Sequence, residues 1–167
     1  LSLDRKLVAV MPEGNRKDIR NAVEAARKAT GWERNTAHGR AQVLYYLAEN
    51  LQAQRSRFVQ TLSLVQTGQQ AADEFDAAIE TLFYYAAWAD KFDGQVHQPP
   101  MHGIVTALNE PLGVIGIVCP DEAPLLGLLA LVAPAIALGN RVVVLPSVAL
   151  PLVATDLYQV LDTSDVP

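Results

Sequence analysis

The side chains that could do chemistry are few and widely spaced along the 167-residue chain. It contains one cysteine, Cys119, and three histidines, His38, His97 and His102, none at the spacing of metal ligands. One thiol excludes an internal disulfide, and we expect no metal site. We expect each histidine to lie on the surface or to be hydrogen-bonded rather than to be catalytic.

Compact motifs of nucleotide and hydrolytic chemistry are absent from the sequence. It contains no G-x-G-x-x-G, P-loop, H-E-x-x-H, C-x-x-C or G-x-S-x-G pattern. Gly113 and Gly116 fall inside a predicted strand and not in the turn after it. We therefore expect these glycines to serve close packing rather than phosphate binding.

Two segments follow predicted strands at the edge where open α/β sheets bind ligands. Residues 118–122 are Val-Cys-Pro-Asp-Glu, and residues 145–148 are Leu-Pro-Ser-Val. Asp121 and Glu122 stand near a predicted helix start, where the helix dipole favours carboxylates, so helix capping is a sufficient role for them. For Cys119, which has no cation nearby in the sequence, a buried structural thiol is the favoured interpretation.

Helices are predicted to precede these segments. Asn15 is a favourable N-cap, and apolar residues recur at helical spacing through the first half of the chain. The expected helices run from Asn15 to Gly31, from about Thr36 through Leu51, from Ser56 to before Gly68, and from Phe75 to before Gly94. The Pro99-Pro100 pair ends this helical half.

Beyond residue 101 the pattern changes to strands and helices in alternation. The β-branched runs are typical of strands buried on both faces of a parallel sheet. The expected elements are strands over 102–109, 112–119 and 141–145, an apolar helix over 125–138, and a helix from Pro151. We predict one α/β domain over 1–167, with helices in 1–98 and a β-α-β-α unit in 101–163. This unit is the start of a doubly wound, Rossmann-like parallel sheet that is truncated.

Composition and charge exclude several classes of protein. Hydrophobic residues make up 50% and charged residues 19%, with a mean hydropathy of +0.15, so the chain is expected to fold. The net charge of −5 argues against a nucleic-acid partner. The uncharged stretch 123–140 is too short for a membrane span and contains two prolines. We expect a cytoplasmic protein whose natural chain extends beyond both ends of this sequence.

Residues 109–126 and 133–147 resemble the start of the cofactor-binding domain of aldehyde dehydrogenases. Residues 22–27, Trp32, Arg40-Ala41 and the segment around Gly68 are similar to the N-terminal helices of that family. The resemblance runs along nearly the whole chain but covers about the first third of a complete module. It is greatest to the second, degenerate module of the sixteenth aldehyde dehydrogenase family, whose members carry two such modules.

Departures from the family pattern fall at functional positions. The resemblance implies an Asn that stabilises an oxyanion where this chain has Glu122, so we assign no catalytic residue. It also implies a Lys and a Glu that hold the adenosine ribose, and these positions are Leu145 and Val148. We expect NAD or NADP binding to be lost or weak. The positions that the resemblance assigns to the cofactor are Val118, Cys119, Pro120, Asp121, Leu145, Ser147 and Val148.

Three functional hypotheses follow. The first is a noncatalytic, pseudoenzyme module with a structural or scaffolding role. The second is part of an active NAD(P)-dependent enzyme that oxidises aldehydes to acids, with the nucleophilic Cys and general-base Glu supplied from beyond residue 167, as the resemblance implies. The third is an interaction module with exposed strand edges, which self-associates or binds another protein domain. The resemblance also implies assembly through the segment 101–109.

Overall fold

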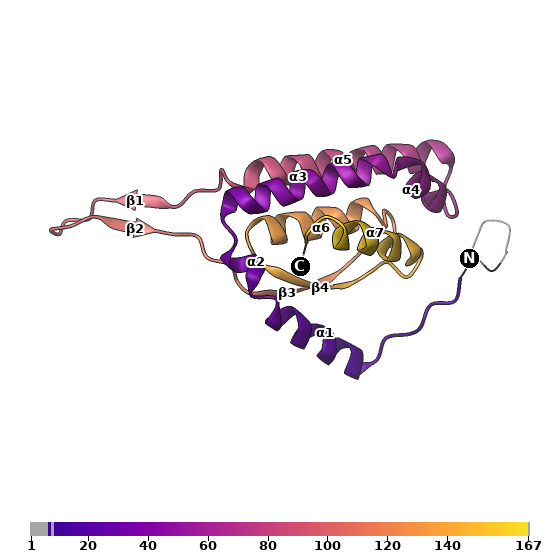
Figure 1. Ribbon diagram of the computed structural model, residues 1–167, viewed down its shortest axis with the longest axis horizontal. Coiled ribbons are helices and arrows are strands. Elements are labelled where there is room, and N and C mark those ends of the chain that lie inside the picture. Colours follow the sequence, from indigo (N-terminus) through magenta and orange to yellow (C-terminus); the bar gives the residue numbers. More distant parts are fainter. Residues whose placement is uncertain (1–6, 8, 167) are drawn as a thin grey trace.

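The computed structural model describes residue 7 and residues 9–166 (Figure 1). The second predicted helix, the apolar helix over 125–138 and the strands over 112–119 and 141–145 are present within two residues of their expected ends, whereas the third helix stops at Leu62 and the fourth starts at Gly68. In chain order the elements are α1 (Arg16–Lys28), α2 (Gly31–Arg34), α3 (Ala37–Ala53), α4 (Arg55–Leu62), α5 (Gly68–Ala89), β1 (Gln95–His97), β2 (Val105–Ala107), β3 (Val114–Val118), α6 (Leu126–Ala137), β4 (Arg141–Leu145) and α7 (Leu152–Asp162).

The helices are arranged in layers around a small parallel sheet (Figure 1). Helices α3 and α5 pack against each other, and α5 also packs on α6. Helices α6 and α7 therefore lie between this outer pair and the β3–β4 sheet, while α1 covers the opposite face of the sheet. The outer pair fills the core with large apolar side chains, which include Leu44, Leu47, Leu51, Phe75 and Leu82, and α4 adds Phe58.

Local signals in the sequence account for the helix ends. Asn15 caps α1 in a capping box with Asp18, as predicted, and Thr36 caps α3. Thr67 caps α5 in a second capping box. Each cap accepts a hydrogen bond from a backbone amide that the first turn of a helix leaves unpaired.

The parallel pair β3–β4 confirms the predicted β-α-β unit, with α6 as its crossover. Val114 is opposite Arg141, and Val118 is opposite Leu145. The prediction that both strands are buried on both faces is wrong, since Ile117 is the one fully buried residue of these described strands. The described sheet has two strands. Helix α1, which covers its outer face, contributes half-buried Ala and Val side chains rather than large apolar ones.

The predicted packing role of the two glycines in and near β3 is also wrong. A Cβ atom at Gly116 would meet no other atom within 4 Å among the described residues, and at Gly113 it would meet only the Arg141 side chain at 3.9 Å. Gly113 instead has a φ of +113°, a backbone conformation that residues with a side chain rarely adopt. Its role is to turn the chain into β3.

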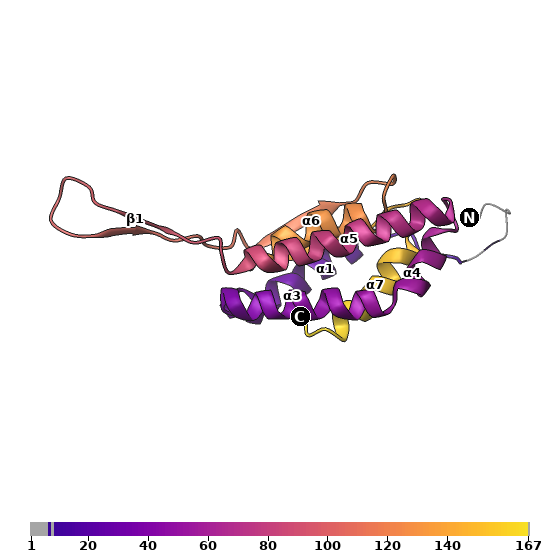
Figure 2. The ribbon, with the colours of Figure 1, turned by 90° about the horizontal axis from the view of Figure 1, so that it is seen from above.

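A long hairpin projects from the body of the molecule (Figures 1 and 2). Strands β1 and β2 pair in antiparallel fashion, and all six of their residues are exposed. We expected helix up to residue 98, but the last helix of this segment ends at Ala89 and β1 follows. At the base of the hairpin the chains approach so closely that a Cβ atom at Gly94 would collide with the carbonyl oxygen of Ala107.

Helix α6 takes the caps at both of its ends from distant parts of the chain. At its carboxyl end, the Trp32 indole donates a hydrogen bond to the carbonyl of Ile136 at 2.8 Å, and the Arg40 guanidinium donates to the carbonyl of Ala137 at 2.9 Å. Burial lowers the pKa of Arg40.

Although α6 is strongly apolar, none of the helices in the described ranges has the length and hydropathy that a membrane span requires.

Candidate functional site

The two segments singled out in the sequence meet at the carboxyl ends of β3 and β4. The amide of Cys119 donates a hydrogen bond to the carbonyl of Leu145 at 2.9 Å, which continues the pairing of the strands beyond their ends. The loop 119–125 and the loop 146–151 therefore start side by side. We call the surface formed by residues 118–122 and 145–149 the mouth of the sheet, and it is the candidate site predicted from the sequence.

The Asp121 carboxylate links the two loops of the mouth. Its Oδ1 atom accepts hydrogen bonds from the Ser147 hydroxyl at 2.7 Å, the Val148 amide at 2.8 Å and the Ala149 amide at 3.2 Å. The hydroxyl of Ser147 and the two amides hold the pKa of Asp121 below its ordinary value. Asp121 therefore does not cap α6, the role that sequence position suggested, because its partners lie in the turn before α7.

Glu122 is exposed, and within the described ranges its carboxylate makes no side-chain hydrogen bond to the protein. It occupies the position at which the resemblance implies an amide that donates to an oxyanion. An ionised carboxylate has no proton to donate. The mouth therefore presents a negative charge where the resemblance implies a hydrogen-bond donor.

Apolar side chains line the remainder of the mouth. Val118 is 73% exposed, Leu145 is 45% exposed and Val148 is 86% exposed. Leu145 and Val148 are at the positions implied for the ribose anchors, and neither side chain can donate or accept a hydrogen bond. Neither of these two side chains therefore offers a hydrogen-bond partner to a ribose hydroxyl.

Cys119 is a buried thiol, 8% exposed, between β3 and the loop that follows. Burial raises its pKa, so the protonated and poorly nucleophilic form prevails at neutral pH. This confirms the predicted burial of Cys119.

A buried carboxylate that the sequence analysis missed binds the start of α6, next to the mouth. Glu74 of α5 is 8% exposed, and its Oε1 atom accepts hydrogen bonds from the amides of Leu125 at 2.8 Å and Leu126 at 3.1 Å. Its Oε2 atom accepts from the Gln66 amide group at 2.7 Å. Glu74 thereby caps α6, which has no capping side chain of its own. The available signal was a charged residue one helical turn before Ala78, in line with the apolar face of the predicted fourth helix.

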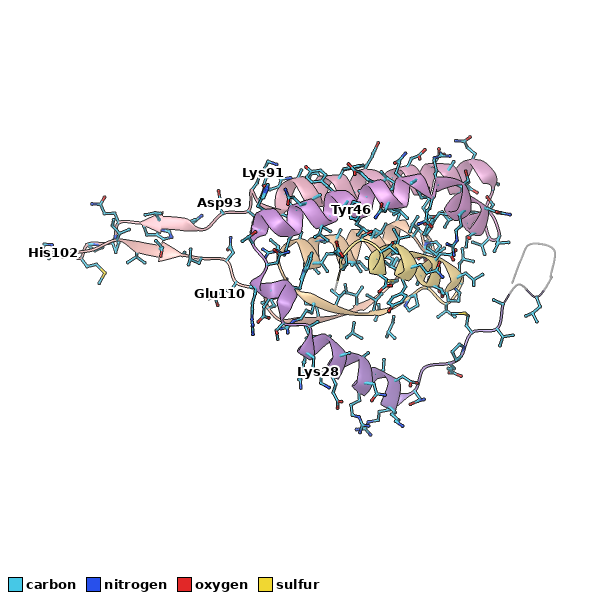
Figure 3. The ribbon with its side chains drawn as sticks, in the orientation of Figure 1. Lys28, Tyr46, Lys91, Asp93, His102 and Glu110 are labelled. Atoms are coloured by element: carbon cyan, nitrogen blue, oxygen red, sulfur yellow. The ribbon has the colours of Figure 1, made fainter. Side chains whose placement is uncertain are left out.

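The histidines do not belong to the mouth. His38 faces Asp90 at 3.4 Å on the surface. His97 and His102 lie on the hairpin, which joins the amino end of β3, and Figure 3 shows His102 at the hairpin tip. In the described part of the chain, no three His, Cys, Asp or Glu side chains come together as a metal site requires.

A cavity of about 690 Å³ lies beside β4 rather than at the mouth. Among its lining residues are Ala26, Val132, Val142, Val144, Leu157 and Leu161, which come from α1, α6, β4 and α7. In the described sheet, β4 pairs with β3 on one side only. The edge of β4 and the apolar surface next to it are therefore accessible, as the sequence predicted.

A helical layer packed on the start of a parallel sheet, with its loops at the carboxyl ends of the strands, defines an α/β protein of the doubly wound class. The profile of the aldehyde dehydrogenase family matches residues 2–167, and the chain belongs to that family. This confirms the resemblance to the family that the sequence indicated.

Known proteins of the family align along nearly the whole chain. It is 33% identical to retinaldehyde dehydrogenase 3 of Mus musculus and 32% identical to that of Homo sapiens, over 96% and 98% of the chain. The crystal structure of betaine aldehyde dehydrogenase from Staphylococcus aureus in complex with NAD⁺ superimposes with a TM-score of 0.93 at 25% identity, over 98% of the chain and 34% of that protein. The chain spans about a third of the length of these relatives, 33% for both retinaldehyde dehydrogenases.

Proposed function

We propose that this chain is a noncatalytic, pseudoenzyme module of the aldehyde dehydrogenase family with a structural or scaffolding role. The observation that carries the proposal is the pair of exposed apolar side chains, Leu145 and Val148, at the positions implied for the ribose anchors. A hydrogen bond to a charged group contributes about 1.5–3 kcal/mol. The loss of two such bonds corresponds to cofactor binding weaker by about a hundredfold or more.

Glu122 supports the loss of catalysis independently of cofactor binding. Removal of one oxyanion donor costs about 2.7–4 kcal/mol of transition-state stabilisation in hydrolases that have been tested. A carboxylate at that position also repels the negative charge that develops on the substrate oxygen. A catalytic thiol placed at this mouth would therefore act without one of its donors and against an adverse charge.

Calorimetric titration of NAD and NADP into the chain tests the proposal. We expect no measurable heat from the wild-type protein, and binding that is about a hundredfold or more tighter after Leu145→Lys and Val148→Glu restore both anchors. Leu138→Lys is a matched control, because Leu138 is similarly exposed, at 38%, but lies outside the mouth. Submillimolar binding by the wild-type chain would contradict the loss of the cofactor site.

The scaffolding role is supported by the projecting hairpin. Its exposed apolar residues include Val96, Met101, Ile104 and Leu108, and an isolated two-stranded ribbon is only marginally stable in water. We propose that the hairpin pairs with a second copy or with another protein domain, and that the protein acts in the cytoplasm. Light scattering should detect association that is lost when Val96 and Ile104 become Asp and kept when Gln98 becomes Asp.

The alternative function is that of an active NAD(P)-dependent aldehyde dehydrogenase within a longer protein. Similarity to retinaldehyde dehydrogenase 3 and to an NAD⁺ complex of betaine aldehyde dehydrogenase favours this alternative. The proposed kinship with the second module of the sixteenth family favours the noncatalytic role. The test is aldehyde oxidation by the longest natural protein that contains this chain. Activity that increases with Glu122→Asn would support the enzyme.

A further inference from the structure

The three hydrogen bonds of Asp121 close the space between the two loops of the mouth. The partners are separated from Asp121 by 26 to 28 residues, so the carboxylate joins the end of β3 to the turn that leads into α7. Ser147 is buried, and its hydroxyl also accepts hydrogen bonds from the amides of Ala149 at 3.2 Å and Leu150 at 3.4 Å. The turn is therefore organised around two side-chain oxygen atoms of the protein itself.

Backbone amides in a turn ahead of a helix are the groups with which α/β proteins bind anionic ligands. In this chain the amides of Val148 and Ala149 already donate to a carboxylate. Among the described residues Asp121 forms no ion pair with a Lys or Arg, and Arg141 pairs with Glu33 at the amino end of β4. An external anion would have to displace Asp121 from these amides.

We propose that Asp121 is an internal ligand that locks the mouth, tying the two loops together and occupying the amides that an anionic ligand would use. This inference rests on the proposed function, in which the mouth no longer holds NAD or NADP. It adds a second structural cause for that loss to the missing ribose anchors. The lock is a property of the chain's own carboxylate. It therefore responds to substitution of that side chain and not to the charge of its neighbour.

Amide hydrogen exchange and titration with inorganic pyrophosphate, both followed by NMR, test the lock. In Asp121→Ala we expect the amides of Val148 and Ala149 to exchange about tenfold faster or more, because each loses a charge-assisted hydrogen bond. We also expect pyrophosphate to shift the resonances of these two amides in a saturable manner. The wild-type protein should show neither effect.

Glu122→Ala is the matched control, because it removes the adjacent negative charge and leaves the three hydrogen bonds in place. Equal pyrophosphate binding by Glu122→Ala and Asp121→Ala would overturn the lock in favour of a simple charge effect. Unchanged exchange in Asp121→Ala would overturn the tie between the loops, and faster exchange without pyrophosphate binding would overturn the exclusion of anions.

A second variant covers the case in which Asp121→Ala does not fold. Asp121→Asn keeps an acceptor oxygen but loses the charge, so we expect a smaller increase in exchange at Val148 and Ala149, and no increase would overturn the lock. The cofactor titration remains separate. NAD binding by the wild-type chain would count against the proposed function, whereas the lock is decided by exchange and pyrophosphate.

Discussion

Replacement of Glu74 by alanine removes the cap of α6 from inside the protein. The carboxylate accepts hydrogen bonds from the amides of Leu125 and Leu126 and from the side chain of Gln66, at 2.7 to 3.1 Å. Leu125 is fully buried, so water cannot replace the lost acceptor there. A buried donor without a partner costs about 1–3 kcal/mol.

We expect Glu74→Ala to lower the free energy of unfolding by about 2–4 kcal/mol, since one amide is left fully buried and the half-buried Leu126 amide is partly rehydrated. Glu74→Gln keeps an acceptor for both amides and should cost about 1 kcal/mol, the net value of an ordinary hydrogen bond. Exchanging the two side chains, with Gln66→Glu and Glu74→Gln together, restores a hydrogen bond between an amide group and a carboxylate and should recover part of that loss.

Urea unfolding followed by circular dichroism measures these differences, and amide exchange at Leu125 and Leu126 locates them. Glu80→Ala is the control, because Glu80 lies on the exposed face of the same helix and should change stability by less than about 0.5 kcal/mol. A loss below about 1 kcal/mol for Glu74→Ala, or equal losses for the Ala and Gln variants, would refute the capping argument.

Three other predictions concern single side chains. Trp32→Phe removes one of the two donors to the Ile136 carbonyl, which keeps the Gly139 amide, and should lower the free energy of unfolding measured in urea by about 0.5–1.5 kcal/mol. No measurable loss would show that the indole hydrogen bond does not stabilise the fold. Burial raises the pKa of Cys119, so at pH 7 the folded protein should react with Ellman's reagent at least about tenfold more slowly than a free thiol, and urea should remove this difference. Rapid reaction of the folded protein would show that the thiol is accessible. Since folding lowers the pKa of Asp121, its carboxylate stabilises the fold above an ordinary pKa of about 3.9, and that contribution disappears as the pH falls through the lower folded-state value. Asp121→Asn should therefore flatten the loss of stability below about pH 4, and an unchanged pH profile would contradict the assignment.

The elements that the sequence predicted well are those fixed by neighbouring residues. Asn15 caps α1 as expected, α3 starts next to Thr36 as expected, and β3, α6 and β4 follow from apolar runs bounded by Gly and Pro. Strand β1 was missed because its residues are exposed and carry little apolar patterning. A strand of that kind is held by its partner β2, which lies beyond a turn, and not by its own composition.

The sequence correctly predicted that the two loops of the mouth lie side by side, but the helix cap that it suggested for Asp121 is wrong. Asp121 stands beside a helix start in the sequence, whereas its donors belong to the loop after β4. The cap of α6 comes from Glu74, which lies 51 residues before Leu125. Such pairings depend on how α5 packs against α6, a contact for which a single sequence carries no local signal.

The distant caps of α6 have a consequence for the order in which the molecule folds. Helix α6 is short, contains Pro134, and has no capping side chain within its own sequence, so as a separate peptide it should have little helical structure. Glu74, Trp32 and Arg40 reach its two ends only when the distant segments that carry them have packed around it. We therefore expect α3 and α5, which supply a capped and locally paired framework, to form early. Protection of α6 amides should then arise in one cooperative step with the docking of the sheet, which makes this helix a kinetic reporter of completed assembly.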